Sequence, residues 1–149
     1  MKIRVAWIQA KPGKDKLPAM QSLTNEYLKR IARYASIEAH EPRNEAALMK
    51  LVEQSRPAPL LVIMDSKGEQ LSSEELGKFI DDQQSRATGV LLFAIGGPDG
   101  FSPELRERAK FMLSLGKMTF PHELARVILL EQMYRAFTIL KGHPYHTGH

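Results

Sequence analysis

Residues 90–100 read VLLFAIGGPDG, a six-residue apolar run that ends in a glycine-rich turn. A second apolar run, LLVIM at 60–64, ends at Asp65. Uninterrupted apolar strands of this kind are typical of a parallel sheet that is covered on both faces. Stretches with helical spacing or helix-capping signals alternate with the strands. The sequence therefore predicts an α/β fold with a largely parallel sheet.

The other elements follow from hydrophobic spacing and from helix-start signals. Further strands are predicted at 3–8, 37–40 and 111–115. Ser72 and Glu75 form a capping-box pattern, and Ser102 precedes Pro103 at a predicted first helical position. Helices are accordingly predicted from about residue 20 to 34, over 46–54, from the capping box to about 86, from Pro103, and from 122 to about 141.

Three segments follow predicted strands and should meet at one edge of the sheet. They are 64–68, 96–100 and 116–121. Parallel sheets bind ligands beyond the carboxyl ends of their strands, so these segments predict a ligand crevice. The glycine loop has neither the Gly-x-Gly-x-x-Gly spacing nor a following Lys-Ser/Thr, which disfavours dinucleotides and triphosphates. From the residues alone the loop is equally a tight turn, and for Asp65 a loop cap is favoured over a ligand-contacting carboxylate.

Length and composition restrict the class of protein. The 149 residues are 43% apolar and 26% charged, which predicts one folded domain over 1–149. The sequence has no cysteine, so disulfides, Cys-ligated zinc and iron–sulfur clusters are excluded. No apolar run approaches the ~18–20 residues that span a bilayer, and residues 1–4 do not lead into a signal-type block. We expect a cytoplasmic protein without a membrane partner.

Positive charge is concentrated in the first part of the chain. The net charge is +4; up to Pro57 there are 11 basic and 6 acidic residues, and after it 10 and 11. This basic excess is compatible with an anionic polymer as partner, and equally with an ordinary solubilising surface.

The C-terminal residues contain the remaining candidates for chemistry. Histidines stand at 143, 146 and 149, but no cysteine or nearby carboxylate completes a metal-ligand set, so no metal is expected. His146 has a side chain suited to proton transfer near neutral pH. Arg126 and Arg135 lie on the last predicted helix, and either can clamp a phosphate. Arg135 can instead pair with Glu131, four residues earlier.

Several motifs, in order along nearly the whole chain, resemble one family. They are EYLKR at 26–30, MDSKG at 64–68, AIGGPDG at 94–100, PHELAR at 121–126, YRA at 134–136 and HPYH at 143–146. Together they resemble the large-subunit (23S) ribosomal RNA pseudouridine N3-methyltransferases, a small branch of the SPOUT class. The family commonly has a basic residue after HPYH, where this chain has Thr147.

This resemblance implies a C-terminal trefoil knot, a homodimer, S-adenosylmethionine as methyl donor, and ribosomal RNA of the assembled ribosome as substrate. His146 is then the candidate base or proton relay, Tyr145 the orienting residue, and Arg135 the contact to a ring oxygen or a phosphate. The cofactor contacts that the resemblance implies are Met64, Gly97, Gly116, Lys117, Met118, Thr119, Phe120 and Pro121.

Two other functions stay open from the sequence. One is a SPOUT methyltransferase that acts on a different RNA, such as a transfer RNA. The other is a non-catalytic RNA- or ribosome-binding protein with the same fold, which need not bind S-adenosylmethionine.

Overall fold

The computed structural model describes residues 1–9 and 17–146, with only the backbone at His146. Its centre is a five-stranded sheet in which every neighbouring pair of strands is parallel, with the order β2-β1-β4-β3-β5. The strands are β1 (Lys2–Trp7), β2 (Ser36–His40), β3 (Leu60–Gln70), β4 (Val90–Ile95) and β5 (Phe111–Ser114). The predicted α/β fold with a parallel sheet is confirmed.

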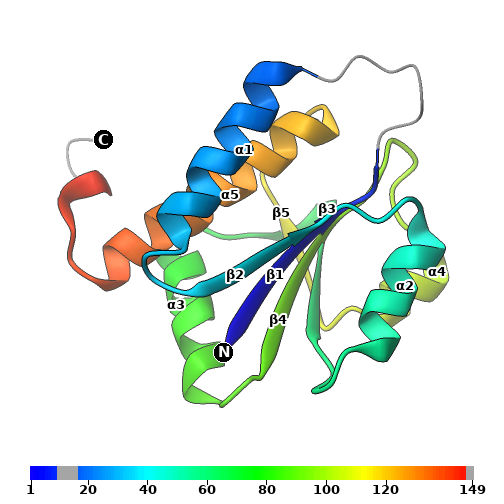
Figure 1. Ribbon diagram of the computed structural model, residues 1–149, viewed down its shortest axis with the longest axis horizontal. Coiled ribbons are helices and arrows are strands. Elements are labelled where there is room, and N and C mark those ends of the chain that lie inside the picture. The colour runs from blue at the N-terminus through cyan, green and yellow to red at the C-terminus, as the bar shows by residue number, and fades with distance from the viewer. Residues whose placement is uncertain (10–16, 147–149) are drawn as a thin grey trace.

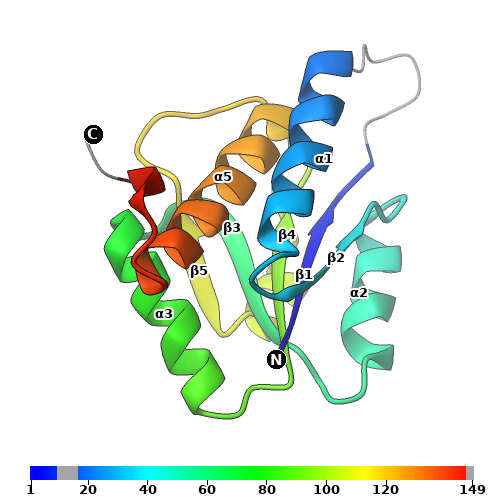
Figure 2. The same ribbon diagram turned by 60° about the vertical axis from the view of Figure 1, so that its left-hand side comes forward.

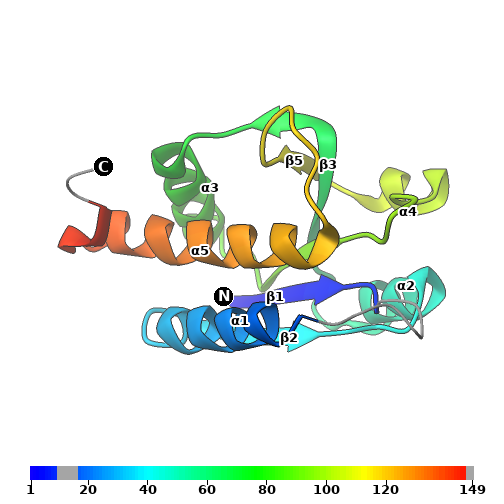
Figure 3. The ribbon, with the colours of Figure 1, turned by 90° about the horizontal axis from the view of Figure 1, so that it is seen from above.

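Helices cover both faces of the sheet, as Figures 1 and 2 show. They are α1 (Pro18–Ile31), α2 (Glu45–Gln54), α3 (Ser73–Ser85), α4 (Pro103–Arg108) and α5 (His122–Leu140), followed by a 3-10 turn, η1 (Pro144–His146). Helices α1, α3 and α5 lie on one face, and α2 and α4 on the other (Figure 3). None of the helices in the described ranges has both the length and the apolarity needed to cross a membrane.

The central strand β4 shows why the apolar runs are uninterrupted. Leu91, Phe93 and Ile95 belong to the core beneath α1, α3 and α5, whereas Leu92 and Ala94 belong to the core beneath α2 and α4. Every residue of β4 is buried. Because successive side chains of a strand point to opposite faces, a strand covered twice must be apolar at every position.

Helix-capping signals are confirmed by hydrogen bonds. The Ser72 hydroxyl accepts from the Glu75 amide at 3.0 Å, and the Glu75 carboxylate accepts from the Ser72 amide at 2.8 Å. The latter bond lowers the pKa of Glu75 below its ordinary value. Ser102 caps α4 through the Leu105 amide at 3.3 Å. Both helices that follow the apolar strands therefore begin where the sequence predicts.

Two predicted boundaries are wrong. Helix α1 ends at Ile31, not near Tyr34, because the chain turns there and the Tyr34 ring stacks on Phe137 of α5, 5.9 Å between centres. Strand β3 does not end at Met64 but continues to Gln70. In both cases a contact with a segment distant in sequence overrides the local pattern.

The extension of β3 wraps around β5. Leu113 of β5 pairs with Met64 and again with Glu69, so β3 leaves its partner and returns to the same residue. At Gly68 the two backbones are so close that a Cβ atom would lie 2.7 Å from the Met112 carbonyl carbon. The wrap brings residues 65–68 against the end of β5, where the candidate site lies.

Candidate active site

A cleft lies at the carboxyl ends of β3, β4 and β5, and all three predicted loop segments contribute to its wall. This confirms that the segments converge. The lining residues are Met64, Asp65, Ser66, Ile95, Gly96, Gly97, Gly100, Leu113, Leu115, Gly116, Met118, Thr119, Phe120, His122 and Ala125. Most of these side chains are apolar or absent, so the cleft has apolar walls with exposed backbone groups.

The backbone at Gly116 sets the turn after β5. Its φ is +135°, a conformation that residues with a side chain rarely adopt. The Ser114 hydroxyl holds this turn by accepting from the Gly116 amide at 3.1 Å and donating to its carbonyl at 2.9 Å. A Cβ at Gly116 or Gly97 would meet no heavy atom within 4 Å. These two positions therefore leave free space in the cleft wall.

Among the described residues, Asp65 is the only carboxylate in the cleft wall, and it is ionised and paired. Its Oδ1 accepts from the Lys67 amide at 2.8 Å, and its other oxygen contacts the Arg106 guanidinium of α4. Burial alone would raise the pKa of Asp65, but the Lys67 amide and Arg106 together lower it. Asp65 is thus both the loop cap and an ion-pair partner that ties the 65–68 segment to α4.

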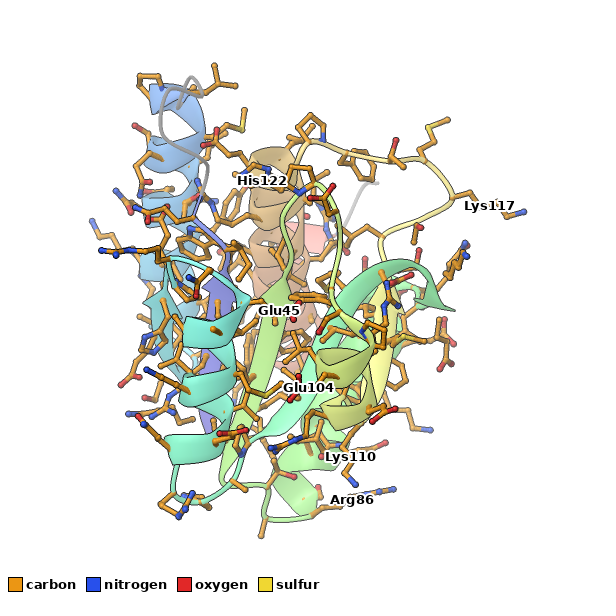
Figure 4. All side chains as sticks on the ribbon, turned by 90° about the vertical axis from the view of Figure 1, so that its right-hand side faces the viewer. Glu45, Arg86, Glu104, Lys110, Lys117 and His122 are labelled. Atoms are coloured by element: carbon orange, nitrogen blue, oxygen red, sulfur yellow. The ribbon has the colours of Figure 1, made fainter. Side chains whose placement is uncertain are left out.

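Six of the eight predicted cofactor contacts line the cleft. The other two, Lys117 and Pro121, do not. Figure 4 shows the Lys117 side chain extending away from the sheet. Pro121 is instead the N-cap residue of α5, and its carbonyl accepts a hydrogen bond from the Ala125 amide at 2.9 Å. His122 and Ala125 were not among the predicted contacts but also line the cleft, and both belong to the PHELAR motif at 121–126.

Two of the predicted catalytic residues, Arg135 and Tyr145, form a second cluster at the far end of α5. Arg135 donates from Nε and Nη2 to Glu131 Oε1 at 3.0 and 2.6 Å, so the predicted i−4 pairing is confirmed. The Tyr145 hydroxyl donates to the same oxygen at 3.1 Å, and the Arg135 guanidinium lies over the Tyr145 ring. Burial raises the pKa of Tyr145 well above its ordinary value, and Tyr27 and Glu131 raise it further. This phenol is protonated at neutral pH.

Within one chain the tail cluster does not reach the cleft. His122 lines the cleft at the start of α5, and Arg135 lies thirteen residues later on the same helix. At 1.5 Å rise per residue the two are about 20 Å apart along the helix axis. The side chain of His146 and residues 147–149 lie outside the described residues. The structure therefore separates Arg135 and Tyr145 from the predicted cofactor contacts.

Glu131→Gln is expected to destabilise the protein by about 2 kcal/mol, because a half-buried carboxylate that accepts charged hydrogen bonds is lost. Glu26→Gln is the matched control, since Glu26 forms the same i,i+4 pair with Arg30 on an exposed part of α1. Exposed pairs of this kind contribute less than about 0.5 kcal/mol. Urea unfolding measures both variants. Equal losses for the two would contradict the role assigned to Glu131.

Comparisons with known proteins agree with this fold. A family model described as a predicted SPOUT methyltransferase matches residues 1–146. The SpoU methyltransferase AviRb from Streptomyces viridochromogenes, solved with the cofactor AdoMet, aligns with a TM-score of 0.50 at 14% identity, over 90% of this chain and 57% of that one. A probable methylase family protein from Haemophilus influenzae aligns with a TM-score of 0.52 at 11% identity, over 94% and 66%. The fold and cleft place the protein in the SPOUT class of methyltransferases.

Curated relatives narrow the class further. Ribosomal RNA large subunit methyltransferase H from Koribacter versatilis is 53% identical over 100% of both chains. The protein of the same name from Geotalea daltonii is 40% identical over 98% of this chain and 99% of its own length. The one from Gloeobacter violaceus is 42% identical over 91% of this chain and 95% of its own length. The chain belongs to the family of ribosomal RNA large subunit methyltransferase H.

Proposed function

We propose that this chain, as one methyltransferase domain over 1–149, transfers the methyl group of S-adenosylmethionine to N3 of a pseudouridine in 23S ribosomal RNA. The observation that carries the proposal is the glycine-bearing cleft at the carboxyl ends of β3, β4 and β5, in a chain of this family. That the methylated RNA is the large-subunit ribosomal RNA is inferred from the names of the relatives. The choice of pseudouridine as the target base, and of N3 as the methylated atom, is implied by the motif resemblance.

The cleft fits S-adenosylmethionine. The apolar walls, which include Met64, Leu115 and Phe120, suit the adenine ring and the methylene groups of the methionine chain. The open positions at Gly97 and Gly116 leave room for the cofactor beside backbone N–H and C=O groups. In the part of the chain that the structure describes, no lysine or arginine lines the cleft, which agrees with a ligand that has no phosphate. When bound, this cofactor supplies an electrophilic methyl group on a positively charged sulfur.

The chain's own residues must then prepare the nucleotide. N3 of pseudouridine carries a weakly acidic proton, and the nitrogen becomes a nucleophile as that proton leaves. We assign His146 to accept the proton, Arg135 to bind an oxygen of the ring or a phosphate, and Tyr145 to orient the base. Since the Tyr145 phenol stays protonated at neutral pH, it serves as a hydrogen-bond donor and an aromatic surface, not as the base.

The separation of cleft and tail supports a homodimer. Because about 20 Å of α5 lies between His122 and Arg135, a site with both sets of residues needs the tail of a second copy beside the cleft of the first. We therefore propose a symmetric dimer in which each cleft is completed by the partner's tail. Closed twofold dimers are the commonest oligomers of soluble proteins.

We also propose that the C-terminal part of the chain is threaded as a trefoil knot. The double pairing of Leu113 with Met64 and with Glu69 supports this topology, since it brings residues 65–70 back onto the end of β5. Such threading is rare among folds, and here it would hold two cleft-lining segments against each other.

The substrate is proposed to be the assembled ribosome in the cytoplasm. Each chain has a net charge of +4, so a dimer carries about +8, which is suited to contacts with RNA phosphates. Tritium transfer from labelled S-adenosylmethionine into ribosomes that lack the modification tests the proposal, with the product base identified by mass. Label in N3-methylpseudouridine is expected. Label only in transfer RNA, or cofactor binding without transfer, would support one of the alternatives.

Mixed dimers test whether the tail acts on the partner's cleft. At an S-adenosylmethionine concentration no higher than the wild-type dissociation constant, a variant weakened in the cleft, Gly97→Val, and a variant blocked in the tail, His146→Ala, are each expected to be nearly inactive. When the two are co-expressed in equal amounts, half of the dimers are mixed, and each has one intact site. About a quarter of the wild-type methyl transfer is then expected. Activity no greater than that of the separate variants would show that the tail does not act in the partner.

A further inference from the structure

Arg126 on α5 is a buried cation that the proposed mechanism does not use. Its side chain is 4% exposed, and its guanidinium carbon lies 4.5 Å from the centre of the Trp7 ring at the end of β1. Its Nε donates to the Thr24 hydroxyl of α1 at 3.0 Å, and that hydroxyl donates in turn to the Met20 carbonyl at 2.8 Å. Three elements of the fold therefore fix the plane and the direction of this guanidinium.

The hydrogen-bonding capacity around Arg126 is largely unused. Among the described residues, its two terminal amino groups have no acceptor and no carboxylate lies within ion-pair distance. The indole N–H of Trp7 is also buried without a partner. An unpaired buried donor costs about 1–3 kcal/mol, and more when it is charged. Among the described residues only the Trp7 indole N–H is such a fully buried unpaired donor, so the terminal amino groups of Arg126 beside it keep some exposure and can take an acceptor that comes from another molecule.

The charges that face Arg126 do not supply this acceptor. Burial lowers the pKa of Arg126, while Glu123 and Glu41 act in the opposite direction. The Glu123 carboxylate accepts instead from the Leu17 amide at 3.4 Å. An arginine remains protonated at any physiological pH, so the site keeps its positive charge.

The Arg126–Trp7 pair lies beside the cleft and not in it. Trp7 pairs with Ile95 on the neighbouring strand, and Ala125 precedes Arg126 on α5. Ile95 and Ala125 line the cleft, whereas Trp7 and Arg126 do not. A group bound at Arg126 would thus be a neighbour of the cofactor, at the same edge of the sheet.

We infer that Arg126, held on Trp7, is a binding site for a phosphate of the RNA backbone next to the target nucleotide. A planar guanidinium matches the geometry of a phosphate with two parallel N–H donors, and stacking on an aromatic ring fixes its plane in advance. The inference rests on the proposed function, because it takes the nucleic acid to approach the cleft from the side of β1.

Trp7 gives a direct measurement, because it is the only tryptophan in the chain. The wild-type protein, saturated with S-adenosylmethionine, is titrated with pseudouridine 3′,5′-bisphosphate and, separately, with unphosphorylated pseudouridine. The bisphosphate is expected to change the Trp7 emission at a concentration at least tenfold lower than the nucleoside. Equal responses, or none, would overturn the inference. A change produced by S-adenosylmethionine alone, abolished in Arg126→Gln, would assign the site to the cofactor carboxylate and would also overturn it.

Two charge-neutralising variants test the same site on ribosomes. Arg126→Gln is expected to lower the slope of log affinity against log salt concentration by about one and to weaken binding by about tenfold or more. Arg108→Gln, on exposed α4 and paired with Glu53, is the control and should change neither. Affinity for S-adenosylmethionine, measured by calorimetry, should stay within about twofold in both variants.

The outcomes separate this inference from the proposed function. If the wild type methylates ribosomes but Arg126→Gln keeps the full salt slope, the phosphate site is wrong and the methyltransferase stands. If the wild type fails to methylate any ribosomal particle, the proposed function is wrong, whatever Trp7 reports. If Arg126→Gln does not fold, the Trp7 titrations of the wild-type protein alone test the phosphate site.

Discussion

Gly97→Val is expected to lower the affinity for S-adenosylmethionine by about ten- to a hundredfold while the protein still folds. Gly97 lines the cleft, and a Cβ there would meet no protein atom within 4 Å. The new side chain therefore fills space that the cofactor needs without disturbing the core. Overfilling a packed site costs about 1–3 kcal/mol, which corresponds to one or two factors of ten in the dissociation constant.

Calorimetric titration with S-adenosylmethionine measures this effect, and thermal unfolding without cofactor serves as the control for folding. Gly97→Ala adds a single methyl group and should lose less affinity than the valine variant, which gives a graded series at one position. Unchanged cofactor binding in Gly97→Val would mean that the cofactor does not occupy the cleft.

Gly68→Ala is expected to destabilise the protein by about 3 kcal/mol, or to prevent folding. The added Cβ would lie 2.7 Å from both the carbonyl carbon and the oxygen of Met112, and 2.9 Å from the Leu113 carbonyl carbon. These are backbone atoms of β5, held by their pairing with β3, so they cannot move aside as a flexible side chain does.

Gly77→Ala is the matched control on α3. A Cβ at Gly77 makes only an ordinary contact, 3.4 Å from the Ala136 carbonyl oxygen. Because alanine is the better helix former, this change should be neutral or should stabilise by up to about 1 kcal/mol. Urea unfolding compares the variants. A neutral Gly68→Ala would show that residues 65–70 do not press against β5 as closely as the structure indicates.

Local patterns predicted most of the architecture. The two apolar runs, the Ser72–Glu75 capping box and the Ser102 cap each depend on residues within one element or one turn, and the structure confirms all of them. The convergence of the three loop segments also followed, because the carboxyl ends of parallel strands share one edge of the sheet. The ion pair of Glu131 and Arg135 was predictable for the same reason, since both lie on one helix at i and i+4.

Other features depend on partners that are distant in sequence. MDSKGEQ at 64–70 has the composition of a turn, yet it belongs to a strand because β5, more than forty residues later, pairs with Met64 at its start and with Glu69 and Gln70 at its end. The C-terminal motif resembled a catalytic element, but nothing in its residues indicated that its partner Arg135 would lie about 20 Å along α5 from His122 at the cleft of the same chain.

By itself, the sequence determined the strands, the capped helices, the glycine-bearing edge and the family, because each of these is encoded in short patterns or in their order. Only the tertiary structure decided that β3 wraps around β5, that Lys117 and Pro121 stand outside the cleft, and that Arg126 lies on Trp7. The physical reason is that backbone pairing and side-chain burial join residues up to 119 positions apart, and such contacts form only when the whole chain is packed.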